Sequence, residues 1–184
     1  MTPRQRDRRE RLLDAGLELL AQVDYESIQV RDVAENAGVS LGTLYKYFAS
    51  KERLFAEVLV RWAENLPTHV KRRPPSQALP IDRLRDTVHR ALHAFERQPQ
   101  MARMVNVLMM STDPASVELI QRLERSSSDV YLQALAGLDP ARSRRIVNVL
   151  QAVFGSELRE WSLGRESMRE VYDELDSALD LLTR

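Results

Sequence analysis

Apolar residues recur every three or four positions along almost the whole chain, the spacing that places them on one face of an α-helix. No run of residues alternates between apolar and polar over the length of a β-strand. We therefore predict an all-α fold. A chain of 184 residues is also long enough to bury a substantial hydrophobic core.

The helical spacing divides into a small N-terminal unit and a larger body, with about nine helices in all. The first predicted helix carries its apolar face on Leu12, Gly16, Leu19, Leu20 and Val23. Two short helices follow over 30–37 and 41–48, on either side of Gly38, and a longer helix over 51–66. Five more helices are predicted over 82–97, 100–110, 114–136, 140–163 and 168–183. Two-turn helices are marginal alone in water, so we expect the short pair to be held by tertiary packing.

Local sequence signals predict where several of these helices begin and where the chain is interrupted. Ser40 and Ser50 stand in N-cap positions. Two Asp-Pro pairs, at 113–114 and 139–140, combine a capping side chain with a proline in the first turn. Residues 167–170 form a capping box. The segment 67–81 contains four prolines and is predicted to be a linker.

The two short helices and their glycine-containing turn have the pattern of a helix-turn-helix, whose second helix enters the DNA major groove. In that second helix Gly42 allows a close backbone approach, and Thr43 offers a hydroxyl and a methyl to base edges. The other candidates are donors to bases or phosphates: Tyr45, Lys46, Tyr47, Lys51 and Arg31, the last suited to a bidentate guanine contact. The alternative is that the tyrosines are core aromatics and that Gly38 only ends a helix.

The formal net charge of zero argues at first against a nucleic-acid binder. The charges are unevenly placed, however. Residues 1–11 contain five Arg against one Asp and one Glu, a net +3, and residues 36–51 contain no acidic residue. Residues 159–184 contain four Arg against seven Asp and Glu, a net −3. A polyanion would therefore meet a basic or neutral surface on the N-terminal unit.

Other classes of protein lack their signals in this sequence. There is no cysteine, no glycine-rich nucleotide loop and no serine-nucleophile motif, so we expect no catalytic residue and no cofactor. His89 and His93 have a spacing that can chelate a metal, but no further ligand motif accompanies them, and we expect no metal site. No apolar run approaches the roughly 20 residues that span a bilayer, and the N-terminus lacks a secretory signal. We therefore expect a cytoplasmic protein with no membrane partner.

Residues 30–54 read VRDVAENAGVSLGTLYKYFASKERL, and this segment resembles the DNA-binding domain of the tetracycline-repressor (TetR) family. The resemblance extends over about residues 8–62. It implies a core formed by Val33, Ala34, Ala37, Val39, Leu44 and Phe48. It also implies that double-stranded operator DNA is faced by Arg31, Leu41, Gly42, Thr43, Tyr45, Lys46, Tyr47 and Lys51. The arginines at positions 4, 6, 8 and 9 either add phosphate contacts or belong to a frayed, solvated terminus.

The resemblance further implies a homodimer formed by the last two helices of each subunit. The helix over 140–163 is apolar around much of its circumference, which permits a second buried face. The expected interface residues are Val149, Ala152, Val153, Ser156, Val171, Leu175, Ala178, Leu179 and Leu182. The alternative is that both faces are buried within one subunit.

The family generally binds a small effector inside the helical body. Four of the six methionines fall within 101–110, and methionine suits an adaptable apolar cavity, although it is equally ordinary core filling. The expected pocket residues are Leu84, Val88, Leu92, Phe95, Met101, Met104, Val105, Leu108, Leu119, Leu123 and Tyr131. We thus expect a helix-turn-helix domain over 1–50, a connecting helix over 51–66, and an effector-binding and dimerisation domain over 67–184.

The segments 94–99, 39–45 and 61–62 resemble the repressors of cholesterol and steroid catabolism within that family, which respond to steroid-derived CoA thioesters. The resemblance implies a dimeric repressor that binds a near-palindromic operator and is released by a small apolar effector such as an acyl- or steroid-CoA. The alternatives are a helical small-molecule-binding or interaction protein without sequence-specific DNA binding, and an enzyme.

Overall fold

A computed structural model of the chain describes the backbone of residues 1–72 and 79–183, and the side chains of 1–64 and 79–182. Within these ranges the protein consists of nine α-helices and one short 3-10 helix, with no β-strand. The predicted all-α fold is therefore confirmed. Over the described part of the chain, no helix is both long enough and apolar enough to cross a membrane.

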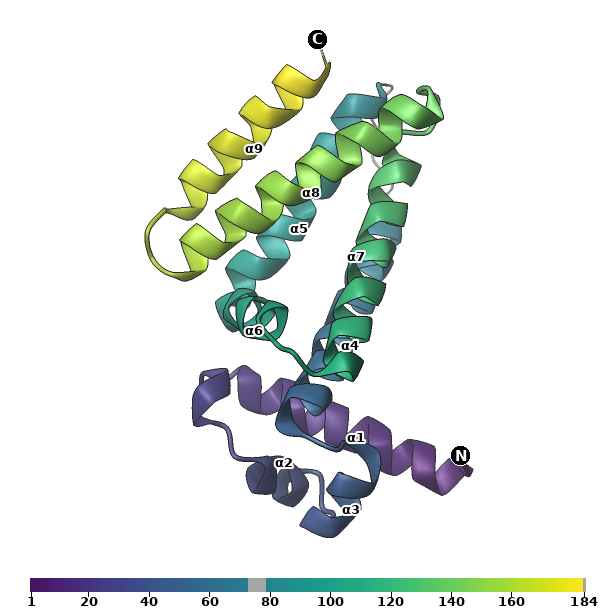
Figure 1. Cartoon of the computed structure of the whole chain (residues 1–184), viewed down its shortest axis with the longest axis vertical. Coiled ribbons are helices and arrows are strands. Elements are labelled where there is room, and N and C mark those ends of the chain that lie inside the picture. The colour runs from purple at the N-terminus through teal and green to yellow at the C-terminus, as the bar shows by residue number, and fades with distance from the viewer. Residues whose placement is uncertain (73–78, 184) are drawn as a thin grey trace.

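The N-terminal unit comprises α1 (Pro3–Leu20), the 3-10 helix η1 (Tyr25–Ser27), α2 (Val30–Asn36) and α3 (Leu41–Tyr47). In Figure 1 this unit forms the lower part of the molecule, with α3 at its outer end. Helix α2 packs on α1 and α3, and α1 packs on the first turns of the next helix.

The body comprises the six remaining helices, of which α7 packs along α4, and α8 and α9 run side by side at the far end (Figure 1). Their bounds are α4 (Lys51–Arg72), α5 (Pro80–Arg97), α6 (Pro99–Met109), α7 (Pro114–Ala134), α8 (Pro140–Ser162) and α9 (Met168–Thr183). Helix α4 contacts both α1 and the body helices α5, α6 and α7, so it connects the two parts of the molecule.

The predicted capping residues make the expected hydrogen bonds. Ser40 Oγ accepts from the backbone N–H of Thr43 at 3.2 Å. The carboxylates of Asp113 and Asp139 accept backbone N–H bonds at 2.8 and 2.7 Å. Each bond satisfies an N–H group that has no partner within its own helix, and so fixes where that helix begins.

The structure differs from the sequence prediction at two places in the first half of the chain. Helix α4 continues through Pro67 to Arg72, beyond the predicted start of the linker, and part of that predicted linker (73–78) lies outside the described residues. A proline removes one backbone hydrogen bond, and a long helix can tolerate that loss. Val23 lies beyond the end of α1 and is exposed, because the helix stops at Leu20.

Buried apolar side chains form two clusters. The first core runs from α1, α2 and α3 through α4 into α6 and the start of α7. The second core joins α5, the end of α7, α8 and α9. The first core therefore does not stop at the predicted domain boundary at residue 50, and the N-terminal unit and the body share one continuous apolar interior through α4.

Candidate DNA-reading face and effector cavity

The turn between α2 and α3 depends on Gly38, whose φ of +64° lies in the left-handed region that favours glycine. The N–H of Val39 donates to the carbonyl of Ala34 at 2.9 Å, and the N–H of Gly38 donates to Glu35 at 3.0 Å. This pair of bonds is a Schellman motif, which ends α2 and turns the chain sharply into α3. Arg11 Nη1 donates to the Ala37 carbonyl at 2.9 Å and ties the turn to α1.

Helix α3 has one buried and one open face. Leu44 and Phe48 are fully buried in the first core, as predicted. On the other side Tyr45 is 51% exposed and Leu41 is 41% exposed. Lys46 and Gly42 are exposed, and a Cβ at position 42 would meet no other atom within 4 Å. An apolar anchor thus holds α3 against the unit, while polar and small residues face outward.

Two predicted DNA-facing residues of α3 are only partly exposed. Thr43 is half-buried, and its hydroxyl lies 2.9 Å from Ser40 Oγ. Tyr47 is half-buried beside Phe48, with 6.5 Å between the ring centroids. On α2, the Arg31 side chain is 77% exposed, and its nearest carboxylate is that of Asp32, at 3.6 Å from Nε.

Lys51 has a different environment from the one that the sequence suggests. Its Nζ donates to the backbone carbonyl of Tyr25 at 2.6 Å and lies 4.3 Å from the centroid of the Tyr25 ring. Burial lowers the pKa of the Lys51 ammonium from its ordinary value, and the nearby Glu26 and Glu52 oppose that shift. Because the ammonium of this half-buried side chain donates to a carbonyl of η1, it fastens η1 to the start of α4 in this structure.

The arginine-rich N-terminus is helical from Pro3, because the Thr2 side chain caps α1 and Gln5 completes a capping box. The three arginines that lie nearest the terminus, at positions 4, 6 and 8, are exposed. Arg9 instead pairs with the buried Glu57 of α4, and its guanidinium lies 5.8 Å from the centroid of the Phe48 ring. Arg9 therefore links α1 to the core below α3.

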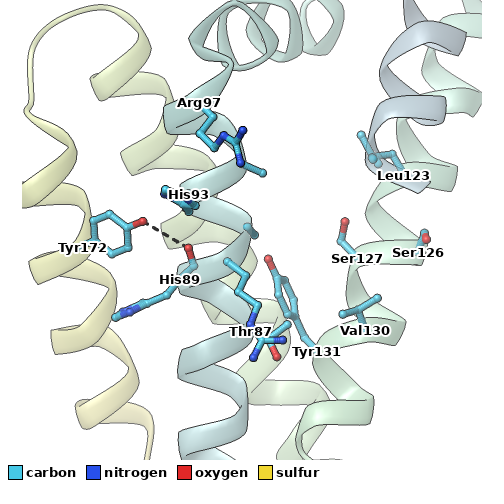
Figure 2. Close-up of a pocket in the computed structure, with 14 residues that line it drawn as sticks. Thr87, His89, His93, Arg97, Leu123, Ser126, Ser127, Val130, Tyr131 and Tyr172 are labelled. Atoms are coloured by element: carbon cyan, nitrogen blue, oxygen red, sulfur yellow. Dashed lines mark hydrogen bonds between the residues drawn. The ribbon is translucent and has the colours of Figure 1, made fainter. Parts of the chain in front are cut away.

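A cavity of about 680 Å³ lies between α5 and α7, with Ala63 of α4 and Tyr172 of α9 at its edges. Figure 2 shows side chains from α5 and α7 converging on this space from opposite sides. The residues that line it are Ala63, Thr87, His89, Arg90, Ala91, His93, Ala94, Arg97, Leu123, Ser126, Ser127, Val130, Tyr131 and Tyr172.

Small side chains at helical spacing explain why the space stays open. On α5, Thr87, Ala91 and Ala94 follow one another by four and three positions, and Ser127 faces them from α7. Packed interiors are normally filled to high density, so a row of small residues on α5 opposite Ser127 leaves a void. This row of small residues was the signal in the sequence that could have located the cavity.

The structure departs from the predicted pocket lining. Of the eleven expected residues, Leu123 and Tyr131 line the cavity. Met101 and Met104 are instead fully buried in the first core, where their flexible side chains fill space between helices. The other expected residues also lie in or against the two cores: Leu84, Val88, Leu92, Phe95, Val105, Leu108 and Leu119. These side chains belong to the packed hydrophobic cores and do not line the cavity.

The two histidines of α5 lie at the cavity in ordinary polar contacts. His89 Nε2 is 2.9 Å from Asp176 Oδ1, and His93 Nδ1 is 3.2 Å from Glu96 Oε2. Asp176 is also bound by Arg85 Nη1 at 2.6 Å. Within the described residues, no three His, Asp or Glu side chains are grouped to hold a metal ion.

The residues expected at a dimer interface divide into two groups. On α8, Val149 is 46% exposed, Ala152 is exposed, and Val153 and Ser156 are half-buried. On α9 the apolar stripe faces inward instead: Val171, Leu175 and Leu179 are fully buried in the second core. The stripe is buried because α9 packs against α5 and α8 of its own chain. Ala178 and Leu182 are half-buried at the edge of that contact.

Besides the Arg9–Glu57 pair, two basic residues of the body form ion pairs with the N-terminal unit. Arg61 of α4 binds Asp14 of α1 at 2.6 Å and also pairs with Glu10. Arg103 of α6 pairs with Asp24, next to η1. The Arg103–Asp24 pair therefore connects the body to the N-terminal unit directly, without α4.

Comparisons with known proteins agree over most of the chain. Residues 12–58 match the family described as bacterial regulatory proteins, tetR family, and residues 78–182 match the tetracyclin repressor-like C-terminal domain. The HTH-type transcriptional repressor KstR of Mycobacterium tuberculosis is 31% identical over 179 residues, which cover 97% of this chain and 81% of that protein.

Solved structures share the fold. The crystal structure of a TetR transcriptional regulator from Rhodococcus sp. RHA1 has a TM-score of 0.84 and 27% identity, and the match covers 98% of this chain and 97% of that one. The structure of Thermus thermophilus FadR in complex with lauroyl-CoA has a TM-score of 0.76 and 20% identity, covering 95% of this chain and 92% of that one.

Proposed function

The chain belongs to the tetR family of bacterial regulatory proteins, and from this premise we propose that it represses transcription as a homodimer on a near-palindromic operator and is released by a small apolar effector. The family membership confirms the resemblance seen in residues 30–54. It also makes the chain a DNA-binding transcriptional regulator of the helix-turn-helix type and not an enzyme. Because such a regulator acts on bacterial DNA, we place its action in the cytoplasm.

The observation that carries the DNA-binding proposal is the outward face of α3. It exposes Tyr45, Lys46 and the open backbone at Gly42, while Leu44 and Phe48 hold the opposite face in the core. No acidic residue occurs between positions 36 and 51. Phosphates therefore meet no like charge along this helix, and base edges are within reach of short and polar side chains.

We assign the reading face to seven residues, without Lys51, whose ammonium donates to the carbonyl of Tyr25. These residues are Arg31, Leu41, Gly42, Thr43, Tyr45, Lys46 and Tyr47. Arg31 suits a guanine contact because its guanidinium is largely exposed and only loosely paired. The exposed arginines of α1 are proposed to bind phosphates.

The homodimer is proposed to form through the outer face of α8, where Val149, Ala152 and Ser156 would meet their copies. A Cβ at the neighbouring Gly155 would meet no atom within 4 Å, so a second helix can approach closely there. Two reading helices one DNA turn apart require such a two-fold arrangement. Sedimentation equilibrium is expected to give a dimer mass for the wild type and a monomer mass for Ala152→Glu.

The cavity between α5 and α7 supports an effector of moderate size with an apolar body, such as an acyl- or steroid-CoA. Its volume of about 680 Å³ falls in the range of small-molecule sites. The exposed Arg97 lies at its edge, where a charged part of the ligand would meet solvent. One relative in fold is a FadR that holds lauroyl-CoA.

Selection of duplexes from a random pool tests the proposed function. We expect enrichment of a near-palindromic sequence, and release of the enriched duplex when lauroyl-CoA or a steroid-CoA is added. Enrichment of no sequence would favour a helical small-molecule-binding or interaction protein without sequence-specific DNA binding. Linkage requires that an effector which weakens DNA binding is itself bound less tightly by the DNA complex, by the same factor.

A further inference from the structure

Tyr131 presents to the cavity a hydroxyl that no residue described by the structure satisfies. The residue lies on α7, its side chain is 6% exposed, and it lines the cavity. Figure 2 shows its hydroxyl end directed into the space between α5 and the Ser127 side of α7. Among the residues that the structure describes, none forms a hydrogen bond with Tyr131 Oη.

Two of the other hydroxyls at the wall, on Thr87 and Tyr172, are already bound. Thr87 Oγ1 donates to the carbonyl of Arg83 at 2.7 Å. Tyr172 Oη donates to the carbonyl of His89 at 3.4 Å, the bond drawn in Figure 2. Buried polar groups in proteins are nearly always paired, because an unpaired one keeps the cost of its lost hydration. Tyr131 Oη opens onto the cavity and forms no hydrogen bond with a described residue, so it is available to a ligand that enters the cavity.

The chemistry of that partner follows from the state of the phenol. Burial raises the pKa of Tyr131 above its ordinary value, so the group stays protonated and can donate. The burial that raises this pKa would also penalise an anion placed beside the hydroxyl. Of the cavity's basic side chains, Arg90 is paired with Asp86, and Arg97 is exposed at the edge. An uncharged acceptor is thus the better match at Tyr131.

We propose that Tyr131 determines effector specificity by donating a hydrogen bond from Oη to an uncharged carbonyl oxygen of the ligand, whose apolar body lies along the small residues of α5. This assignment rests on the proposed function, because it concerns the same cavity. It adds that the effector is a ketone, ester or thioester and not a plain hydrocarbon. A site built to bond a polar group discriminates against the analogue that lacks it, because the protein's donor is then left unpaired.

Androstanone and androstane test this assignment, since they share one ring skeleton and differ by a ketone oxygen. Their dissociation constants are measured without DNA, by native mass spectrometry or calorimetry, for the wild type, Tyr131→Phe and Tyr172→Phe. Tyr172→Phe is the matched control, because it also removes a hydroxyl from the cavity wall, but one that is already bound to the His89 carbonyl.

The wild type is expected to bind the ketone about tenfold more tightly than the hydrocarbon, as one neutral hydrogen bond allows. Tyr131→Phe is expected to bring that ratio close to one with the androstane affinity unchanged, while Tyr172→Phe keeps the preference. The melting temperature of ligand-free Tyr131→Phe should equal or exceed that of the wild type, because no internal bond is lost.

The assignment would be overturned if Tyr131→Phe kept the preference for the ketone. It would also be overturned if the wild type showed no such preference, or if the wild type bound neither probe. Operator release is measured separately, on the selected duplex. If Tyr131 sets the preference but neither ketone binding nor a CoA thioester alters operator binding, the proposed effector response fails while the role of Tyr131 stands. If the wild type releases the operator in response to a CoA thioester but does not prefer the ketone, the role of Tyr131 fails while the proposed effector response stands.

Discussion

The N-terminal unit and the body are built from the same kind of amphipathic helix, yet they use their interiors in opposite ways. The N-terminal unit packs so closely on α4 that a Cβ at Gly16 of α1 would lie 2.9 Å from Val58 Cγ2. In the body, a row of small residues on α5 borders an open cavity between α5 and α7. The solid unit can present outward side chains in fixed positions, whereas the hollow body can accept a guest. Tight packing suits a region that presents side chains to DNA, and the cavity offers the volume that the proposed effector would fill.

The largest expected difference between the two regions is in the cost of removing a side chain. Phe48→Ala should lower the free energy of unfolding by about 3–5 kcal/mol, because Phe48 is fully buried below α3. Leu123→Ala should cost less than about 2 kcal/mol, because Leu123 already borders a void. Urea denaturation of both variants measures the two costs. Equal losses would show that the body is packed as tightly as the N-terminal unit.

Substitutions that add a larger side chain should also affect the stability of the two regions differently. Gly16→Leu is expected to destabilise the protein by about 1–3 kcal/mol, since the α1–α4 contact has no room for a side chain. Ala91→Leu is expected to leave stability unchanged or raised, because the new side chain enters the cavity, and to abolish binding of androstanone. Thermal denaturation and ligand titration check both statements. Destabilisation by Ala91→Leu comparable to that by Gly16→Leu would mean that the cavity is not available space.

Substitutions of two basic residues test the roles assigned to the reading face. Arg31→Ala should cost about 1–3 kcal/mol and relax base preference at one operator position. Lys46→Ala should weaken binding to all sequences alike and reduce the salt slope by about one. Arg122→Ala, which removes an exposed charge from α7, serves as the control and should change neither quantity. Loss of affinity by Arg31→Ala that is equal for every base variant would remove its assigned role.

The smallest expected effect concerns the N-terminus of α7, which forms one wall of the cavity. Hydrogen bonds from the Ser116 hydroxyl and backbone N–H lower the pKa of the Asp113 carboxyl from its ordinary 3.8. Because the folded-state pKa lies below the unfolded value, this cap stabilises the fold above about pH 4, and its contribution is lost as the pH falls through the folded-state pKa. Asp113→Asn keeps an acceptor without a titrating group. Its unfolding midpoint should therefore fall less steeply with acid than that of the wild type, and parallel curves would contradict the role.

The sequence predicted the helices well because their ends are marked locally. Asp113 and Asp139 cap the helices that begin at the next proline, and Gly38 supplies the left-handed backbone geometry of the α2–α3 turn. The buried side of α3 was also predictable, since Leu44 and Phe48 recur at helical spacing. These features depend on residues close together in the chain.

Features that depend on how distant helices meet were harder to predict. Met101 and Met104 look like a flexible pocket lining, but the position of α6 between neighbouring helices makes them core. The stripe of α9 looks like a dimer surface until α5 and α8 of the same chain are seen to cover it. Lys51 looks like a phosphate ligand, yet the carbonyl of Tyr25 lies beside its ammonium. In each case a side chain's periodicity is clear, but its partner comes from a segment whose position the local sequence does not give.

The dissociation constants of the protein for the selected operator and for a scrambled duplex of the same composition test the central claim most directly. They are measured at physiological salt for the wild type and for the Thr43→Ala/Lys46→Ala double variant. We predict that the wild type prefers the operator by about a thousandfold or more, and that the variant loses most of this preference at an unchanged melting temperature. Equal affinity of the wild type for both duplexes would contradict a sequence-reading role for α3.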